Sequence, residues 1–357
     1  MRSVWMVVVS CAALACGAEG ETNTGTDSSG SSSDGTGAMV TAAASTSSTS
    51  STSTSSTAVS SSGQPNGSST GPGSTGAAGS SSSGGSNSIC EVGGLPARWQ
   101  DGTRCPEETV QVHRYSDDTF ILRQSLCTGF EAPFLYLLFG EDRVLLEDTG
   151  YNGVDVASVV SGIIDARLAE RGQESIELVV VNSHGHGDHV GGNAQFQGLP
   201  NTTVVGFDVP SISSFFGIDN WREEVAEYDL GGRVLDVIPI PGHQSAHVAL
   251  FDRAEGLLLT GDTLYPGRLY IQDFPTYVAS VERMVAHVES QEVCRVFGTH
   301  IEMTDQPGVD FDFGADEHPG ERALELGLEH LVELRDAVVA MDEPVQEVHD
   351  DFIIFPL

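Results

Sequence analysis

Lysine is absent from this 357-residue sequence, and all 16 of its lysine-or-arginine positions are arginine. Against 51 aspartates and glutamates, these arginines leave a formal net charge of −35 at pH 7. A field of this sign opposes binding to phosphate backbones, because that binding requires lysine and arginine to neutralise the phosphates. The composition therefore excludes nucleic acid as an expected partner.

Cysteine is also scarce, with six residues in the chain and no CxxC pair among them. The absence of CxxC argues against a cysteine-rich zinc knot and a thioredoxin-like redox site. Cys90, Cys105, Cys127 and Cys294 remain beyond the first 16 residues, and an even number in an exported chain predicts disulfides. Four cysteines allow three connectivities, of which we favour the one with a short local Cys90–Cys105 bond.

Apolar residues at the start of the chain form only a short run. Residues 1–16, MRSVWMVVVSCAALAC, carry one charge at Arg2, then an apolar core and small residues. The run is too short for a membrane span and is typical of an export signal. Cys16 fits the lipidated residue of a lipoprotein, with Cys11 as the competing position. We expect a lipid-anchored protein in the periplasm, outer membrane or cell surface; plain secretion and an intracellular chain are the alternatives.

Composition divides the rest of the chain in two. Residues 17–88 are almost entirely serine, threonine, glycine and alanine. Such a segment cannot bury enough apolar area to offset the entropy of ordering, so we interpret it as a disordered tether. Residues 89–357 are long enough for one large domain with a core.

Short apolar runs alternate with helical patterns in this domain. The period-2 and continuous apolar runs predict strands, and apolar spacing of three to four residues predicts helices. Strands are expected at 119–127, 133–139, 142–147, 176–182, 203–207, 233–238, 246–252, 256–260, 294–299 and within 349–357. Helices are expected at 154–171, 190–196, 275–290 and 320–341.

Residues 182–193, NSHGHGDHVGGN, concentrate metal-ligand residues directly after a buried strand. On an extended loop, His184 and His186 point the same way and can chelate one ion. Asp188 and His189 can then face a second ion. Imidazole and carboxylate are ligands that zinc-like ions take, so the pattern favours a metal site over a solvated histidine-rich loop.

Three later strand ends each supply one further ligand-type residue. His243 follows a Pro-Gly turn in IPIPGHQSAH, Asp262 follows an apolar run in LLLTGDTLYPGR, and His300 follows another in VFGTHIE. Sites in α/β folds form beyond the carboxyl ends of strands, so we expect these side chains to meet the histidine-rich loop.

From about residue 119 to 300 the sequence resembles the metallo-β-lactamase superfamily. The resemblance implies an α/β fold, a four-layer αββα sandwich of the metallo-β-lactamase type. It also implies two divalent metal ions, Zn²⁺ first among them, with Fe or Mn as alternatives. By resemblance the first ion takes His184, His186 and His243, the second takes Asp188, His189 and His300, and Asp262 bridges the two.

The resemblance suggests roles for residues around these ligands. His247 is expected to orient a ligand, and Asp148 of the DTG stretch either supports the metal loop or simply forms a turn. Lactone hydrolases of this superfamily carry a tyrosine in a place comparable to Tyr265, which could donate to a developing oxyanion or merely pack in a turn. Arg268 could bind a substrate carboxylate, but we expect it, like His318, at the surface.

The implied function is a dinuclear hydrolase in which a metal-bound hydroxide attacks an ester, lactone or thioester carbonyl, with Asp188 orienting the nucleophile. Glyoxalase II grips an anionic glutathione conjugate with basic residues near its C-terminus, whereas residues 301–357 here hold only Arg322 and Arg335. True β-lactamases of the superfamily lack the bridging aspartate that Asp262 would supply. We therefore expect a small neutral or amphipathic substrate. The alternatives are a mononuclear-iron persulfide-dioxygenase-like enzyme, a β-lactamase, and a non-catalytic metal-binding surface module.

Overall fold

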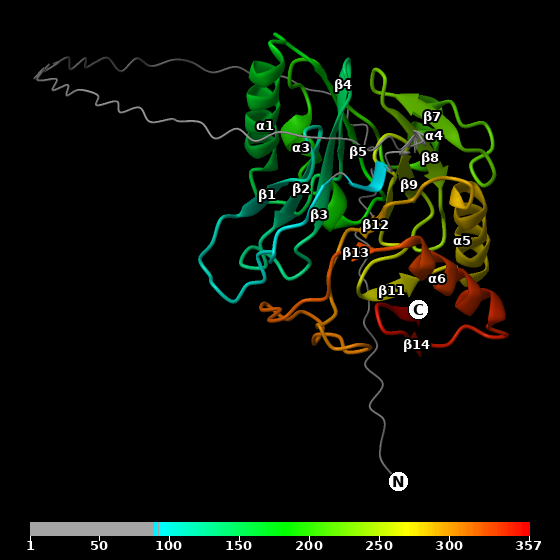
Figure 1. Ribbon diagram of the computed structural model, residues 1–357. Helices are drawn as coiled ribbons and strands as arrows, with labels where there is room; N and C mark the ends of the chain where they lie inside the picture. Colours follow the sequence, from blue (N-terminus) through cyan, green and yellow to red (C-terminus); the bar gives the residue numbers. More distant parts are fainter. Residues whose placement is uncertain (1–88, 92) are drawn as a thin grey trace, which may run out of the picture. The chain divides into compact units, whose positions relative to one another are not determined.

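The computed structural model describes residues 89–91 and 93–357 (Figure 1). The predicted export signal at 1–16 and the predicted tether at 17–88 lie outside the described residues. In the part of the chain that is described, none of the helices has the length and apolar character needed to cross a membrane.

Two six-stranded sheets form the centre of the domain (Figure 1). The first has the order β1-β2-β3-β4-β5-β6, and the second has the order β13-β12-β10-β9-β8-β7. The strands of the first sheet are β1 Val110–Arg114, β2 Thr119–Gln124, β3 Phe134–Phe139, β4 Arg143–Glu147, β5 Glu177–Val181 and β6 Thr202–Val204. Those of the second are β7 Ala226–Asp229, β8 Val234–Pro239, β9 Val248–Asp252, β10 Leu257–Gly261, β12 Arg295–Gly298 and β13 Glu325–Leu326.

Strand β3 shows how the sheets are layered. All six of its residues, FLYLLF, are buried, and successive side chains point to opposite faces of the sheet. Phe134, Tyr136 and Leu138 pack into a core shared with the second sheet. Leu135 and Leu137 pack on the other face, against the helices that cover the first sheet. Burial on both faces explains why this strand lacks an apolar–polar alternation.

Helices cover the outer face of each sheet. Helices α1 Val156–Arg171 and α3 Asn193–Phe196 contribute to the core on the first sheet, and α5 Phe274–Val288 and α6 Leu328–Ala340 contribute to the core on the second. The layers therefore run α, β, β, α, which confirms the predicted αββα sandwich. A small third sheet, β11 Arg268–Ile271, β15 Ile353–Pro356 and β14 Glu347–Val348, contributes to the core on the second sheet. The remaining elements are η1 Ile89–Glu91, α2 Gly187–Val190 and α4 Val209–Phe216.

Two helix predictions were wrong in detail. The helix expected at 320–341 begins only at Leu328, because residues 325–326 form β13 and extend the second sheet. The helix expected at 190–196 is broken into α2 and α3 at Gly191 and Gly192. A Cβ on Gly192 would lie 2.4 Å from the carbonyl oxygen of Thr149, so glycine permits a close backbone approach here. Strands β1, β7, β11, β13 and β14 and helix α4 were not predicted.

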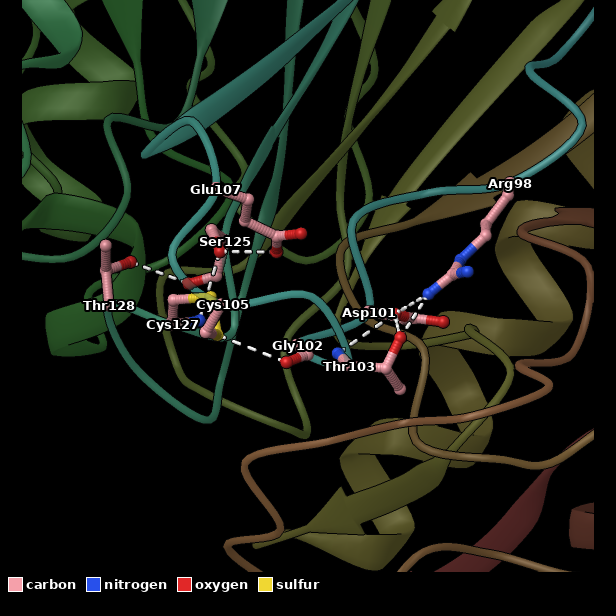
Figure 2. Close-up of a disulfide and its surroundings, with 9 residues drawn as sticks. All are labelled: Arg98, Asp101, Gly102, Thr103, Cys105, Glu107, Ser125, Cys127 and Thr128. Atoms are coloured by element: carbon pink, nitrogen blue, oxygen red, sulfur yellow. Dashed lines mark hydrogen bonds and ion pairs between the residues drawn. A yellow bond between two sulfur atoms is a disulfide. The ribbon is translucent and has the colours of Figure 1, made fainter.

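The predicted Cys90–Cys105 disulfide is also wrong. Cys90 bonds to Cys294, just before β12. Cys105 bonds to Cys127, just after β2 (Figure 2). The first bond joins residues 204 apart in the chain. Proximity in sequence was a poor guide because the fold places Cys90 beside β12.

Strand directions bring the ligand-type residues to one edge. Strand β9 is antiparallel to both β8 and β10, and β12 is parallel to β10. Strands β8, β10 and β12 therefore point the same way, and their carboxyl ends precede His243, Asp262 and His300. Strand β5 of the first sheet delivers the histidine-rich loop to the same place.

Candidate metal centre

All seven side chains predicted as metal ligands come together in the structure, in two groups. Within each group, every residue offers a ligand atom, and these atoms all lie within 4.8 Å of one another. The first group is His184, His186, His243 and Asp262, and the second is Asp188, His189 and His300.

Ring nitrogens in the first group face one another at short range. His186 Nδ1 lies 2.9 Å from His184 Nε2 and 3.1 Å from His243 Nε2. Asp262 Oδ2 lies 3.6 Å from His184 Nε2 and 3.4 Å from His243 Nε2. Three nitrogen atoms and one carboxylate oxygen directed at a common centre form a donor set that suits a zinc-type ion.

Asp262 also faces the second group, through its other oxygen. Asp262 Oδ1 lies 3.4 Å from His189 Nε2 and 3.3 Å from His300 Nε2. Asp188 Oδ2 lies 3.1 Å and 3.3 Å from the same two nitrogens. One carboxylate thus presents a separate oxygen to each group, which is the arrangement a bridging ligand needs.

Hydrogen bonds fix the rings through the nitrogen that points away from each group. His243 Nδ1 lies 2.6 Å from the carbonyl oxygen of Tyr270, and His300 Nδ1 lies 2.8 Å from that of Glu131. A carbonyl oxygen only accepts, so Nδ1 donates and Nε2 keeps its lone pair for a cation. The sequence could not indicate these two partners, because both are backbone atoms.

Asp148 fixes the ring of His189 by accepting a hydrogen bond from Nδ1. Its Oδ2 lies 2.8 Å from His189 Nδ1, and the carboxylate also accepts from the backbone N–H and hydroxyl of Ser183. Asp148 is fully buried, as is Ser183. Of the two roles predicted for Asp148, support of the metal loop is the one that this geometry matches.

Burial favours the neutral form of all three histidine rings in the first group. It holds the pKa of His184 well below the usual histidine range and lowers the pKa values of His186 and His243. The same cause holds the pKa of His247 well below that range. Neutral imidazoles are the form that binds metal, so these rings need not lose a proton first.

Carboxylates dominate the second group. Burial opposes protonation of His189 and His300, yet the facing carboxylates of Asp188 and Asp262 raise both pKa values well above the usual range. Burial likewise opposes ionisation of Asp262, yet the facing histidines hold its pKa well below the ordinary value. In the absence of a cation, protons on these two rings balance the buried negative charge.

The surroundings of one buried atom fit a cation. His189 Nε2 is buried and has no hydrogen-bond partner, although it lies between two carboxylates. Buried polar atoms are normally satisfied, and an exception calls for an explanation such as a missing ion. The residues therefore fit a metal centre, with ligand atoms turned inward and the opposite ring atoms held.

Glycine and histidine pack closely behind Asp262. Gly261 has φ +51°, and a Cβ there would lie 2.4 Å from His247 Nε2. The His247 ring lies 4.7 Å from that of His184, and its Nδ1 lies 3.3 Å from the Thr263 hydroxyl. This position behind a ligand ring is compatible with the predicted orienting role, which stays a prediction.

Two residues that we expected at the surface are buried, so those expectations were wrong. The Arg268 guanidinium is paired with Asp310 at 2.8 Å and also donates to the carbonyl of Phe311. His318 stacks on Phe311 with ring centroids 4.2 Å apart. Arg268 packs against the segment that follows His300, and His318 lies within that segment, which packs as a folded wall.

The ring of Tyr265 lies near the second group, but its hydroxyl hydrogen-bonds elsewhere. Its ring centroid lies 5.5 Å from that of His300. The hydroxyl donates to the carbonyl of Arg268 and lies 3.4 Å from Glu302 Oε2. Donation to an oxyanion would require this proton to leave the Arg268 carbonyl, so that role stays a prediction.

Two acidic residues beside the second group were not predicted. Burial raises the pKa of Glu131 to about 7, with Asp188, Glu302 and Asp262 adding to the effect. Burial also raises the pKa of Glu302. Their only sequence signal was position: Glu302 follows His300 by two, and Glu131 lies in the loop before β3.

Two distinct cavities of the described residues lie away from these ligands. One, of about 600 Å³, is bounded by segments 95–103 and 319–325. The other, of about 290 Å³, lies between α1 and strands β1 and β2. Chemistry, rather than cavity size, therefore identifies the candidate site.

Residues 128–341, more than half of the chain, match the family model described as the metallo-beta-lactamase superfamily. The chain belongs to this superfamily. The match covers all seven ligand-type residues and the strands that carry them.

Several curated proteins are similar to this chain over part of their length. The hydroxyacylglutathione hydrolase of Methylococcus capsulatus is 33% identical over 183 residues, which are 50% of this chain and 66% of that protein. The one of Rhizobium meliloti is 34% identical over 127 residues, 35% of this chain and 48% of that protein. The chain thus spans less than two thirds of these relatives. A solved metallo-beta-lactamase from Pontibacter korlensis aligns over 65% of this chain and 100% of its own, with a TM-score of 0.43 and 14% identity.

Proposed function

We propose that this chain is a dinuclear metal-dependent hydrolase that cleaves an ester, thioester or lactone carbonyl. The observation that carries the proposal is the bridging position of Asp262, which presents one oxygen to each group. The proposed ligands are His184, His186 and His243 for the first ion, Asp188, His189 and His300 for the second, and Asp262 for both.

Two zinc-type ions, when bound, supply the Lewis acidity that lowers the pKa of water toward neutrality and polarises a carbonyl. The chain holds the cations with two carboxylates, so the loaded site keeps a net positive charge that favours a developing oxyanion. Asp188 remains partly exposed at 14% of its side chain. We infer that Asp188 accepts a proton from an attacking water, and its partial exposure supports this role.

Metal content and turnover together test the proposal. We expect the purified full chain to bind two equivalents of zinc and to hydrolyse at least one member of a panel of esters, thioesters and lactones. His186→Ala should abolish turnover while the circular dichroism spectrum is retained. His113→Ala, in β1 and away from the ligands, is the matched control. One bound iron would instead support a persulfide-dioxygenase-like enzyme, and hydrolysis of cephalosporins alone would support a β-lactamase.

A non-catalytic metal-binding module is the remaining alternative. It predicts two bound ions without turnover of any substrate. The intact ligand set argues against it, because a scaffold that had lost its activity would be free to lose a ligand.

We also propose that the protein is exported and lipid-anchored through Cys16. The two disulfides support this location, since such bonds persist in oxidising compartments. Detergent fractionation of cells is the test. The wild-type chain should partition with membranes, whereas Cys16→Ser should be released into the soluble fraction; a wild-type chain found in the cytosol would refute the proposal.

A further inference from the structure

Exposed aromatic rings are rare on this domain, and those that occur lie beside the metal-ligand loops. All 15 phenylalanines fall within the described part of the chain, and Phe207 and Phe313 are the two with exposed rings, at 44% and 70%. Small-molecule sites are lined mainly by apolar and aromatic side chains, so exposed rings beside a candidate site are candidates for ligand contact.

Phe207 lies over the loop of the first group. A Cβ on Gly185, between His184 and His186, would lie 3.1 Å from the Phe207 ring and 3.2 Å from the amide nitrogen of Gln244. Gln244 itself follows His243 directly. Phe207 therefore forms an apolar wall beside the first group of ligands.

Phe313 belongs to a second wall, beside the other group. Its ring packs against Phe130 with centroids 5.5 Å apart. Phe130 directly precedes Glu131, whose carbonyl holds the His300 ring. Tyr151 lies close to the same loop, 3.8 Å from a Cβ position on Gly129. Aromatic rings from three separate segments thus gather on the side of His300.

The loop that presents Phe130 is held firmly. The Cys105–Cys127 disulfide closes one end of it, and the Ser125 hydroxyl donates to Glu107 (Figure 2). The Thr128 hydroxyl donates to the carbonyl of Ser125 at 2.6 Å. A wall held in this way loses little conformational freedom when a ligand packs on it.

Charge in this region is negative. The segment after His300 carries the exposed acidic residues Asp312, Asp316 and Glu317, which flank Phe313 in the sequence. Arg268 and Arg123, which lie in or against this wall, have guanidinium groups bonded to Asp310 and Glu321. Neither is free to bind a substrate carboxylate.

We propose that Phe207 on one side and the Phe130–Phe313 pair on the other bind the uncharged apolar substituent of the carbonyl substrate, and that the site discriminates against a carboxylate at that position. The inference rests on the proposed hydrolase function and names its substrate class. Contact with the rings favours binding of an apolar substituent, while neighbouring carboxylates repel a substituent that carries a negative charge.

A matched substrate series tests this inference on the zinc-loaded full chain. Within the ester, thioester or lactone class that is hydrolysed, three members are compared: the unsubstituted compound, a hexyl-bearing compound, and one ending in a carboxylate. We expect kcat/KM for the hexyl compound to exceed that of the carboxylate compound by at least about tenfold, which corresponds to about 1.4 kcal/mol. An equal or higher value for the carboxylate compound would overturn the proposal.

Variants test which side chains contact the apolar substituent. Phe313→Ala and Phe207→Ala should each lower the hexyl-to-unsubstituted ratio of kcat/KM several-fold, mainly through KM. Val345→Ala removes an apolar side chain near the C-terminus whose exposure, 55%, lies between those of Phe207 and Phe313, and it should leave the ratio unchanged. Ratios that stay at the wild-type value in both phenylalanine variants would overturn the proposal.

Binding separates this inference from the proposed function. If no substrate class is hydrolysed, the hydrolase proposal fails. Calorimetric titration with 1-octanol then still tests whether the aromatic walls bind an apolar group. Binding that weakens in Phe313→Ala but not in Val345→Ala would support them. The absence of octanol binding to the wild-type chain, in the absence of hydrolysis, would refute them.

Discussion

Replacement of Asp148 by asparagine should disable one metal site while leaving the fold intact. Asp148 adopts φ +66°, a left-handed conformation that asparagine tolerates about as well as aspartate, so the backbone is not strained. The change removes one negative charge and replaces an acceptor oxygen with an amide donor. Its effect should therefore be local to the three hydrogen bonds that this carboxylate accepts.

The expected loss follows from the His189 tautomer. With its oxygen toward the Ser183 N–H, an asparagine at 148 would place its amide group toward His189 Nδ1, which now donates at 2.8 Å. Two donors cannot face each other, so the proton moves to Nε2, the atom turned toward the second group. Loss of such a supporting partner typically weakens metal affinity by about 10–100-fold.

Competition with a chromophoric chelator measures this directly. We expect Asp148→Asn to keep one tight zinc site and to bind the second about 10–100-fold more weakly. Asp336→Asn, at a side chain with 66% exposure, is the isosteric control. Two sites of unchanged affinity in Asp148→Asn would refute the reasoning about the tautomer.

Three further outcomes are expected. Chelation should lower the melting temperature, because zinc at about 1,000 times its Kd adds roughly 4 kcal/mol to the free energy of unfolding; stripping without a shift would contradict this. In chelated protein, the free energy of unfolding of Glu131→Gln should rise relative to that of wild type between pH 5 and pH 8. Burial raises the pKa of Glu131 in the folded protein to about 7, so wild type loses stability as pH rises from the ordinary carboxyl pKa toward 7. Glutamine does not titrate and avoids this loss. The gain should be on the order of 3 kcal/mol, and a pH-independent difference in melting temperature would exclude it. Glu321→Gln should cost about 3 kcal/mol in urea unfolding, because Arg123 would keep a buried charge without its bidentate partner, and the double change Arg123→Met with Glu321→Leu should recover most of that loss.

The ligand groups could be predicted from the sequence because each ligand follows a strand with a strong apolar signal. His243, Asp262 and His300 each come directly after such a run, and strand ends converge in this class of fold. The parts that could not be predicted depend on the backbone or on distant contacts. The carbonyls of Glu131 and Tyr270, which hold two ligand rings, have no signature in residue type.

Burial of polar residues was the other source of error. Arg268 and His318 are of residue types that are usually exposed, but both are buried. Arg268 packs against the segment that follows His300, and His318 lies within that segment. Cys90 and Cys294 pair across 204 residues for a similar reason, since the fold, and not the spacing, brings them together. Local patterns therefore predicted elements and ligands but not the walls that enclose them.

The Cys90–Cys294 bond also determines how the domain would bear a mechanical load. A pulling force applied to the chain before residue 89 passes through this covalent bond directly to the base of β12, instead of first through residues 93–109. Strand β12 is an inner strand, hydrogen-bonded to β10 and β13, so the load enters the sheet at a well-supported position. Traction from the N-terminal side would therefore reach the strand that carries His300 at its opposite end without first unravelling the domain.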